Sequence, residues 1–250
     1  MIKVIYSEKQ VADTGLQPIA QKGYTASPSA NKPKQVAEAL RNSGLNIEFV
    51  EPEPLTVDDF KLAHDSQFVD DVMSLKRKNG FGTFSQSVID SLPYTNGAQY
   101  TAAKLATADN PACALVSGFH HAGYAGFEKL GWFCTFNGLM ITAVKFVSEG
   151  KKVAIIDCDM HWGNGTDDIL KHLPEKSIRH LSFGRYFNHP SHAEDYLSWL
   201  SSYDGIVSKL LEKFKPDLIL YQAGADVHVN DHYGGVLTTN EMRERDLRMF

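Results

Sequence analysis

The sequence has few cysteines and no pattern that would pair them. Cys113, Cys134 and Cys158 are the three in the 250 residues, and none has CxxC spacing. An odd count without that spacing indicates a reducing compartment. Each cysteine lies in an apolar or aromatic run, where we expect it to behave as a small buried hydrophobe.

Long apolar runs are also lacking. No stretch approaches the ~18 residues that a membrane-spanning helix needs. The first six residues, MIKVIY, turn polar too soon for a signal peptide. We therefore expect a cytoplasmic protein with no membrane partner.

An excess of positive charge is absent as well. The net charge is −5, the pI is near 6.0, and the Lys and Arg residues are scattered along the chain. Without a basic stripe, we expect no direct contact with nucleic acid. The 43% hydrophobic content is enough to bury a full core. We expect a single domain over residues 1–250.

Short β-branched or aromatic runs alternate with longer amphipathic stretches throughout the chain. The predicted strands are 2–6, 47–50, 113–117, 153–156, 178–183 and 218–222. The predicted helices are 33–41, 57–76, 95–108, 136–148, 196–214 and one that begins at Thr239. This alternation predicts an α/β protein with a mostly parallel central sheet covered by helices on both faces.

Histidine and aspartate gather where three of the predicted strands end. In open parallel sheets, ligands bind beyond these carboxyl ends of the strands. The three segments are Gly118-Phe119-His120-His121, Asp157-Cys158-Asp159-Met160-His161 and Ala223-Gly224-Ala225-Asp226-Val227-His228.

The second segment has the spacing of a metal site. In an extended chain, residues two apart project to the same side, so Asp159 and His161 can enter one pocket. Asp226, from a different strand, would complete three protein ligands and leave room for water and substrate, as in a catalytic zinc site. A solvent-exposed polar strand end is the alternative. A second Asp-x-His, Asp226 and His228, favours the metal, since a cation would offset the converging charges.

The adjacent pair His120 and His121 offers acid and base groups beside that site. A pair with separated pKa values could share the two roles. The alternative is one buried histidine bonded to a carbonyl and one exposed. Gly118 and Gly123 flank the pair and allow the backbone to turn there.

These segments resemble the histone deacetylase family, which includes acetylpolyamine amidohydrolases and acetoin-utilisation deacetylases. The resemblance covers most of the chain and keeps the family's order of motifs. The matching segments are Gly118 to Ala122, Phe133-Cys134-Thr135-Phe136-Asn137, Asp157 to Thr166, and Ala223 to His228 followed by Gly234-Gly235. The implied fold is the three-layer, arginase-like α/β fold.

The resemblance implies a function and a role for each matching residue. It implies hydrolysis of an acetylated lysine or small acylated amine, with one Zn²⁺ per chain on Asp159, His161 and Asp226. His120 and His121 would be the catalytic dyad, with Asp157 orienting His120 and Asn164 behind His121. A monovalent cation such as K⁺ would use Asp157, Asp159, His161, Ser182 and Phe183. Phe133 would form one wall of the substrate tunnel, with Tyr186 or Phe187 facing it.

The sequence departs from the family pattern in three places. Trp162 replaces the second His that often follows the metal His, and residues 27–33 replace a His-Pro-Glu-Arg-Pro region. The family's Gly-rich tyrosine loop is expected after Thr239, but the sequence given ends at Phe250. We therefore expect the chain as given to bind zinc and to turn over slowly.

Two other functions compete with the deacetylase hypothesis. A binding protein that keeps the pocket without catalysis would release no acetate. A two-metal ureohydrolase would need a second carboxylate two residues after His161, where this chain has Gly163.

Overall fold

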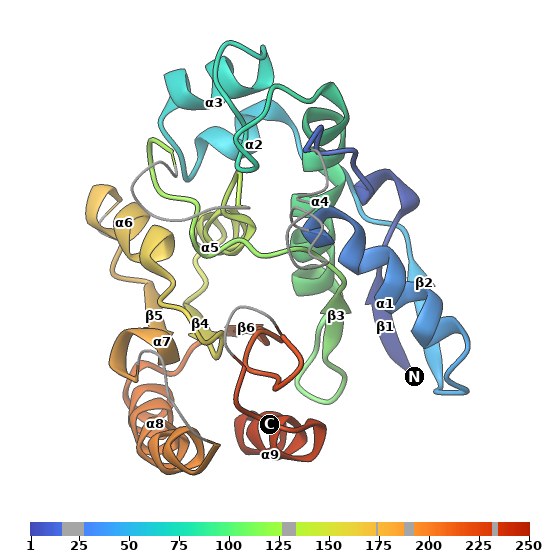
Figure 1. Ribbon diagram of the computed structural model, residues 1–250. Coiled ribbons are helices and arrows are strands. Elements are labelled where there is room, and N and C mark those ends of the chain that lie inside the picture. Colours follow the sequence, from blue (N-terminus) through green and yellow to red (C-terminus); the bar gives the residue numbers. More distant parts are fainter. Residues whose placement is uncertain (17–27, 127–133, 174, 188–192, 232–234) are drawn as a thin grey trace.

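The computed structural model describes residues 1–16, 28–126, 134–173, 175–187, 193–231 and 235–250 (Figure 1). The described strands form two three-stranded parallel sheets, ordered β2-β1-β3 and β5-β4-β6. Their bounds are β1 Ile2–Ile5, β2 Ile47–Val50, β3 Ala112–Ala114, β4 Val153–Asp157, β5 Ile178–Ser182 and β6 Leu218–Gln222. The predicted parallel α/β architecture is confirmed, with its described strands divided between two sheets.

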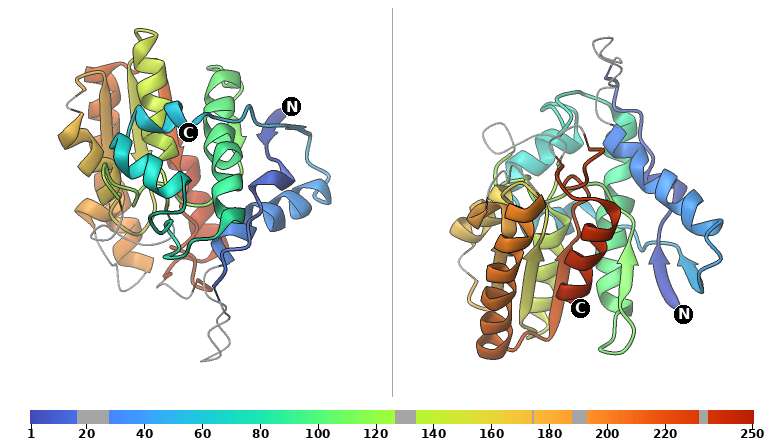
Figure 2. Two further views of the ribbon diagram at one scale, coloured as in Figure 1. Left: turned by 90° about the horizontal axis from the view of Figure 1, so that it is seen from above. Right: turned by 60° about the horizontal axis from the view of Figure 1, so that its bottom comes forward.

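Helices cover both faces of both sheets (Figure 2). In the second sheet, Val153 and Ile155 of β4 face one core, while Ala154 and Ile156 face another. This division follows from the two-residue alternation of a strand. The longer helices are α1 Lys32–Arg41, α4 Gln86–Leu105, α5 Gly138–Ser148, α6 Asn164–His172, α8 Ala193–Phe214 and α9 Thr239–Met249. Helix α5 packs on one side of β4, and α8 and α9 pack on the other.

The long helix predicted over residues 57–76 is wrong. The structure has α2, Val57–Lys61, and α3, Ser66–Met73. Asp65 starts α3 by accepting a hydrogen bond from the backbone N–H of Phe68 at 2.8 Å. The neighbouring His64 is buried and turns toward the Gly123 carbonyl, so the chain leaves the helical path between α2 and α3.

Other boundaries also differ from the prediction. Helix α4 begins nine residues before the predicted start at Thr95, with Ser85 as its N-cap and Pro93 inside it. Strand β5 ends at Ser182, and the short helix α7, Phe183–Tyr186, follows directly. A proline ordinarily marks the end of a helical pattern, which is why the sequence placed the start of α4 too late.

Cys113 is exposed, although a buried side chain was expected. Its neighbours on β3, Ala112 and Ala114, pack against Ala98 and Ala102 of α4. Because side chains alternate along a strand, Cys113 must project to the other face. Cys134 and Cys158 are buried, and all three cysteines have free thiols.

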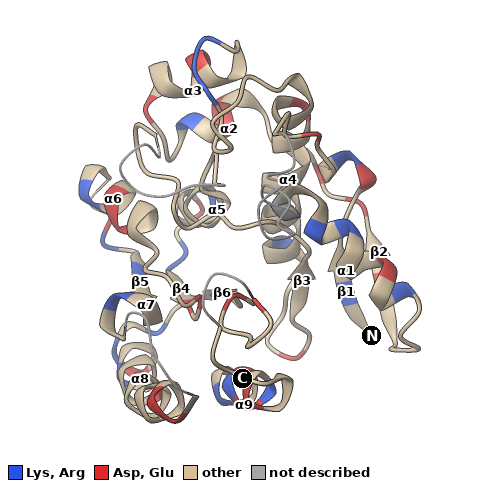
Figure 3. Ribbon diagram, viewed as in Figure 1, with Lys and Arg blue, Asp and Glu red and all other residues tan. Residues whose placement is uncertain are grey.

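Charges of both signs are interspersed along the described chain (Figure 3). None of the helices in the described ranges is both long and apolar enough to cross a bilayer.

Candidate metal site and histidine pair

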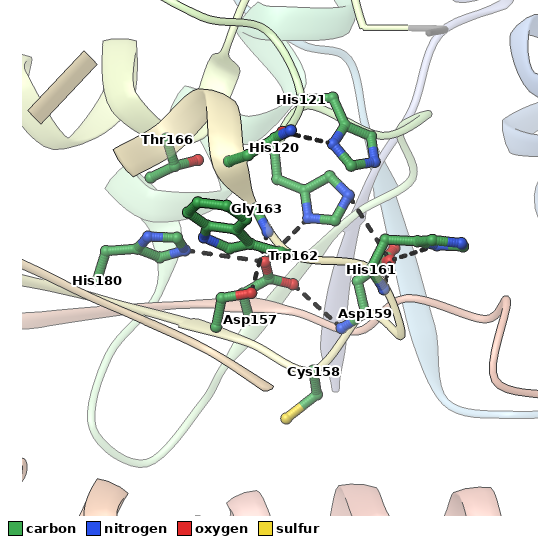
Figure 4. Close-up of polar contacts among 12 residues, drawn as sticks. His120, His121, Asp157, Cys158, Asp159, His161, Trp162, Gly163, Thr166 and His180 are labelled. Atoms are coloured by element: carbon green, nitrogen blue, oxygen red, sulfur yellow. Dashed lines mark hydrogen bonds and ion pairs between the residues drawn. The ribbon is translucent and has the colours of Figure 1, made fainter. Parts of the chain in front are cut away.

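Parallel pairing brings the three predicted ligands together at one edge of the second sheet. Asp157, the last residue of β4, lies opposite Gln222, the last residue of β6. Asp159 and His161 continue the chain beyond β4, and Asp226 continues it beyond β6. Figure 4 shows Asp159 and His161 directed to the same region, next to His120 and His121.

The three ligand atoms of Asp159, His161 and Asp226 lie within 4.8 Å of one another. Nδ1 of His161 is 2.6 Å from Oδ2 of Asp226 and 3.4 Å from Oδ1 of Asp159. The side chains are 14%, 31% and 16% exposed in chain order, so the cluster is shielded but open on one side. Such shielding with access suits a site that must admit a substrate.

The chemistry of this donor set fits zinc. Carboxylates and imidazole are among the ligands that bind zinc in proteins, and three protein ligands leave a position for substrate. The two carboxylates also crowd each other. Burial and the charge of Asp159 raise the pKa of Asp226. A cation between the two carboxylates would offset their repulsion.

The first histidine of the pair is buried and held by a carboxylate. Nδ1 of His120 donates to Oδ2 of Asp157 at 2.9 Å, and its Nε2 lies 3.6 Å from Oδ1 of Asp159. Asp157 is fully buried. Burial alone would lower the pKa of His120, but the charges of Asp159 and Asp157 together raise it to about 9.

The second histidine is held by a neutral partner. Nδ1 of His121 donates to Oδ1 of Asn164 at 2.8 Å. Burial and the neighbouring charge of His120 lower the pKa of His121 to about 4. The two ring centroids are 4.2 Å apart, so two histidines in contact have pKa values that are shifted in opposite directions.

Comparison with known proteins agrees with this geometry. The family model described as "Histone deacetylase domain" matches residues 27–195 and 186–249. This chain belongs to that family. The resemblance inferred from the motifs is thereby confirmed.

Among individual relatives, an uncharacterized protein of Picosynechococcus sp. is 29% identical in an alignment of 174 residues, and this alignment covers 63% of this chain and 55% of the relative. Acetoin utilization protein AcuC of Staphylococcus aureus is 30% identical in an alignment of 143 residues, and this alignment covers 48% of this chain and 36% of AcuC. The chain therefore spans about half or less of the length of these relatives.

Two solved structures share the fold. The HDA15 HD domain has a TM-score of 0.74 at 19% identity, covering 99% of this chain and 80% of that chain. Acetylpolyamine aminohydrolase from Burkholderia pseudomallei has a TM-score of 0.75 at 15% identity, covering 96% and 87%. These matches confirm the predicted arginase-like fold.

The residues predicted to bind a monovalent cation include Asp159 and His161 of the candidate metal cluster, together with residues at the ends of β4 and β5. Asp157 pairs with Ser182 in the sheet, and Ser182 Oγ accepts a hydrogen bond from the backbone N–H of Gly163 at 3.0 Å. Phe183 follows at the start of α7. The backbone of His161 lies directly against Gly184. The structure thus places the β4 and β5 residues of this predicted site side by side.

The predicted tunnel residues have different surroundings. Phe133 lies outside the described residues. Tyr186 is exposed on α7. Phe187 is partly buried and stacks on Trp199 of α8, with ring centroids 5.6 Å apart.

His228 does not join the metal cluster, although the sequence suggested that it converges there. Its Nε2 lies 3.1 Å from Oγ1 of Thr239, and its Nδ1 accepts from the backbone N–H of Asn230 at 3.2 Å. The chain turns over residues 225–228, where the backbone N–H of His228 donates to the carbonyl of Ala225 at 3.1 Å, so residues 226 and 228 do not project together as they would in a straight strand.

The sequence reasoning missed His180, a buried residue of β5. Its Nδ1 donates to Oδ1 of Asp167 at 2.9 Å, and its Nε2 lies 3.8 Å from Oδ2 of Asp157. Burial lowers its pKa, but the two carboxylates outweigh this and raise it. The available signal was a histidine between Ile178 and Leu181, inside the predicted strand 178–183.

The sequence reasoning also missed His64, which supports the loop that carries the histidine pair. Its Nδ1 donates to the Gly123 carbonyl at 2.8 Å, and its Nε2 accepts from the backbone N–H of Asn137 at 2.8 Å. The Asn137 side chain in turn donates to Thr166 Oγ1 and to the Ala122 carbonyl. An isolated histidine 56 residues before the pair gives no sequence signal of this contact.

Proposed function

We propose that this chain is a zinc-dependent deacetylase that hydrolyses an acetylated amine to acetate and the free amine. The observation that carries the proposal is the convergence of Asp159, His161 and Asp226 beside two histidines that have separate partners. Membership of the histone deacetylase family supports it. Zinc held by the three side chains would act as a Lewis acid on the acetyl carbonyl.

The hydrogen bonds of the pair suggest how its protons move. Because Nδ1–H of His121 is donated to Asn164, the neutral ring presents the lone pair of Nε2, which can accept the proton of an attacking water. His120 is fixed by Asp157 in the same way through Nδ1, which leaves Nε2 toward Asp159. A histidine of the pair then protonates the leaving amine, and the products are acetate and an amine.

We assign the substrate class as acetyl-lysine or acetylpolyamine. One structural neighbour is named an acetylpolyamine aminohydrolase, and one relative is an acetoin utilization protein. We also propose that K⁺ binds at Asp157, Asp159, His161, Ser182 and Phe183, where the β4 and β5 strand ends adjoin.

The structure disfavours the two-metal ureohydrolase alternative. A carboxylate at position 163 would have to grow from a Cβ only 2.5 Å from Oδ2 of Asp157. That overlap leaves no place for the second bridging carboxylate. We therefore expect one zinc per chain.

The test measures zinc content and acetate release together, with an acetyl-lysine peptide and an acetylated diamine as substrates. Asp159→Ala and Asp226→Ala should each lose bound zinc and acetate release, since two ligands cannot hold a three-ligand site. Asp90→Ala, on α4, is the matched control and should keep both. Full zinc occupancy in either site variant would overturn the assignment. Zinc binding without acetate release by the unaltered chain would favour the alternative of a binding protein. Two metal ions per chain would favour the ureohydrolase.

A further inference from the structure

Arg245 is a buried cation on the inner face of α9. Its side chain is 1% exposed, although the helix around it is polar. The capping box of Thr238 and Glu241 begins α9. This start fixes which residues face inward, and Arg245 is among them. Burying a guanidinium is costly unless all its partners are supplied, so its contacts should reveal what it does.

The guanidinium charge is balanced within α9 itself. Nε and Nη2 of Arg245 lie 2.8 and 2.7 Å from Oδ1 of Asp246. The same oxygen accepts a hydrogen bond from the Tyr221 hydroxyl of β6 at 2.6 Å. Because Asp246 already neutralises the cation, the remaining nitrogen is not needed for charge balance.

That remaining nitrogen joins the two segments that carry the metal ligands. Nη1 donates to the carbonyl of Gly224 at 2.5 Å and to the carbonyl of Cys158 at 3.3 Å. Cys158 immediately precedes Asp159, and Gly224 lies two residues before Asp226. One buried donor group therefore contacts the backbone of both segments.

The two segments also touch each other at this point. A Cβ on Gly224 would lie 2.6 Å from Cα of Asp159, so the backbone of one segment rests on the ligand residue of the other. The backbone N–H of Met160 donates to Oδ1 of Asp226 at 3.1 Å. The separation between Asp159 and Asp226 is therefore sensitive to how the Gly224 and Cys158 carbonyls are held.

We propose that Arg245 is a positioning residue that holds the Asp159 and Asp226 segments at the spacing that metal binding requires. This inference rests on the proposed function, because it concerns the metal site of that activity. Arg245 contacts neither metal ligand directly. It acts from α9 through the backbone carbonyls of Cys158 and Gly224.

The experiment compares Arg245→Met, Arg245→Lys and Arg248→Met. The Arg248 variant is the matched control: it lies on the same helix and anchors it to Ser201 and Asp204 of α8, without contact to the ligand segments. Zinc affinity is measured by competition with a chromophoric chelator, Co²⁺ coordination by its visible spectrum, and stability by urea unfolding of the metal-free chains.

Arg245→Met should weaken zinc binding by about 10- to 100-fold, as loss of an outer partner of metal ligands typically does. Its Co²⁺ spectrum should change because the ligand spacing is released. Arg245→Lys should recover part of the affinity, since one ammonium can donate to both carbonyls. Arg248→Met should lose stability alone, with zinc affinity and spectrum close to those of the unaltered chain.

An unaltered affinity and spectrum in Arg245→Met would overturn the inference while leaving the proposed function intact. An equal loss of affinity in Arg248→Met would also overturn it, because a general loosening of α9 would then explain the effect. If Arg245→Met does not fold, the lysine variant decides: a reduced zinc affinity and a changed Co²⁺ spectrum at normal stability support the positioning role, and an unaltered affinity and spectrum contradict it. No zinc binding by the unaltered chain would defeat both proposals.

Discussion

The two adjacent histidines show how single partners set the chemistry of otherwise identical side chains. His120 donates to a buried carboxylate, and His121 donates to an amide oxygen. A carboxylate stabilises the imidazolium, whereas an amide fixes the neutral tautomer without adding charge. The second histidine is therefore the one of the two that is neutral near pH 7 and has a lone pair with which to accept a proton.

His121→Ala should keep zinc and lose most activity. General-base catalysis typically contributes ~10²–10⁴-fold, and the substitution removes the acceptor while leaving all three metal ligands in place. Acetate release and zinc content are measured on the same preparation, with His172→Ala on α6 as the control histidine. An unchanged rate across pH would show that His121 is not the base.

Gly165→Ala should displace the loop that carries His120 and His121. A Cβ there would overlap the backbone of His121 and Ala122, so the loop must move. Such overpacking typically costs about 1–3 kcal/mol of stability, and displacement of His121 should lower acetate release more than tenfold.

Gly205→Ala is the matched control. This residue of α8 has open space around its Cβ position, so alanine should stabilise the helix by ~0.5–1 kcal/mol and leave the rate unchanged. Urea unfolding and acetate release test both variants. Normal activity in Gly165→Ala would mean that the loop adjusts without moving the pair.

At the scale of elements, the N-terminus of α5 is tied to the site. Asn137 caps α5 by accepting from the backbone N–H of Met140 at 3.1 Å. Its amide nitrogen donates to Thr166 Oγ1 at 3.0 Å and to the Ala122 carbonyl at 3.2 Å. One side chain therefore starts a core helix and joins it to α6 and to the histidine loop.

Asn137→Ala should reduce both stability and activity. Loss of an N-cap alone typically costs about 0.5–2 kcal/mol, and here the Ala122 carbonyl also loses a buried donor. The control is Ser85→Ala, which removes the N-cap of α4 away from the site. Both variants should unfold at lower urea, but only Asn137→Ala should release acetate more slowly. Equal rates of acetate release in the two variants would show that the Asn137 cap does not support the site.

At the scale of the whole molecule, His64 should make folding sensitive to acid. Burial lowers its pKa to about 4, because protonation would place a charge in the core and remove the acceptor for the Asn137 N–H. In the unfolded chain its pKa is about 6.5. The unfolded state therefore binds the extra proton first as pH falls.

The stabilising contribution of neutral His64 is fully present above pH 6.5 and is lost as pH falls from 6.5 to 4. A one-proton difference changes the free energy of unfolding by about 1.4 kcal/mol per pH unit, or about 3 kcal/mol over the window. His64→Gln should be less stable at pH 7 and show a shallower slope in this window. Urea unfolding at several pH values tests it, and parallel slopes would contradict the assignment.

The sequence by itself determined the α/β class and the convergence of Asp159, His161 and Asp226. Asp159 and His161 are two residues apart beyond an apolar strand, and Asp226 follows another. The carboxyl ends of parallel strands meet at one edge, so these residues had to converge once the strands paired in parallel. The pair His120 and His121 could be found in the same way, because it also follows a predicted strand, 113–117.

Only the tertiary structure decided which polar residues support that cluster. His64 and Arg245 fall in or next to predicted helices, and His180 falls in a predicted strand, so none of the three stands out in the sequence as part of the site. Their roles depend on carbonyls and carboxylates that are distant along the chain, such as Gly123, or Cys158 for Arg245. Local periodicity reports which face a residue occupies, but burying a charged or polar side chain is favourable only when the fold supplies its partners.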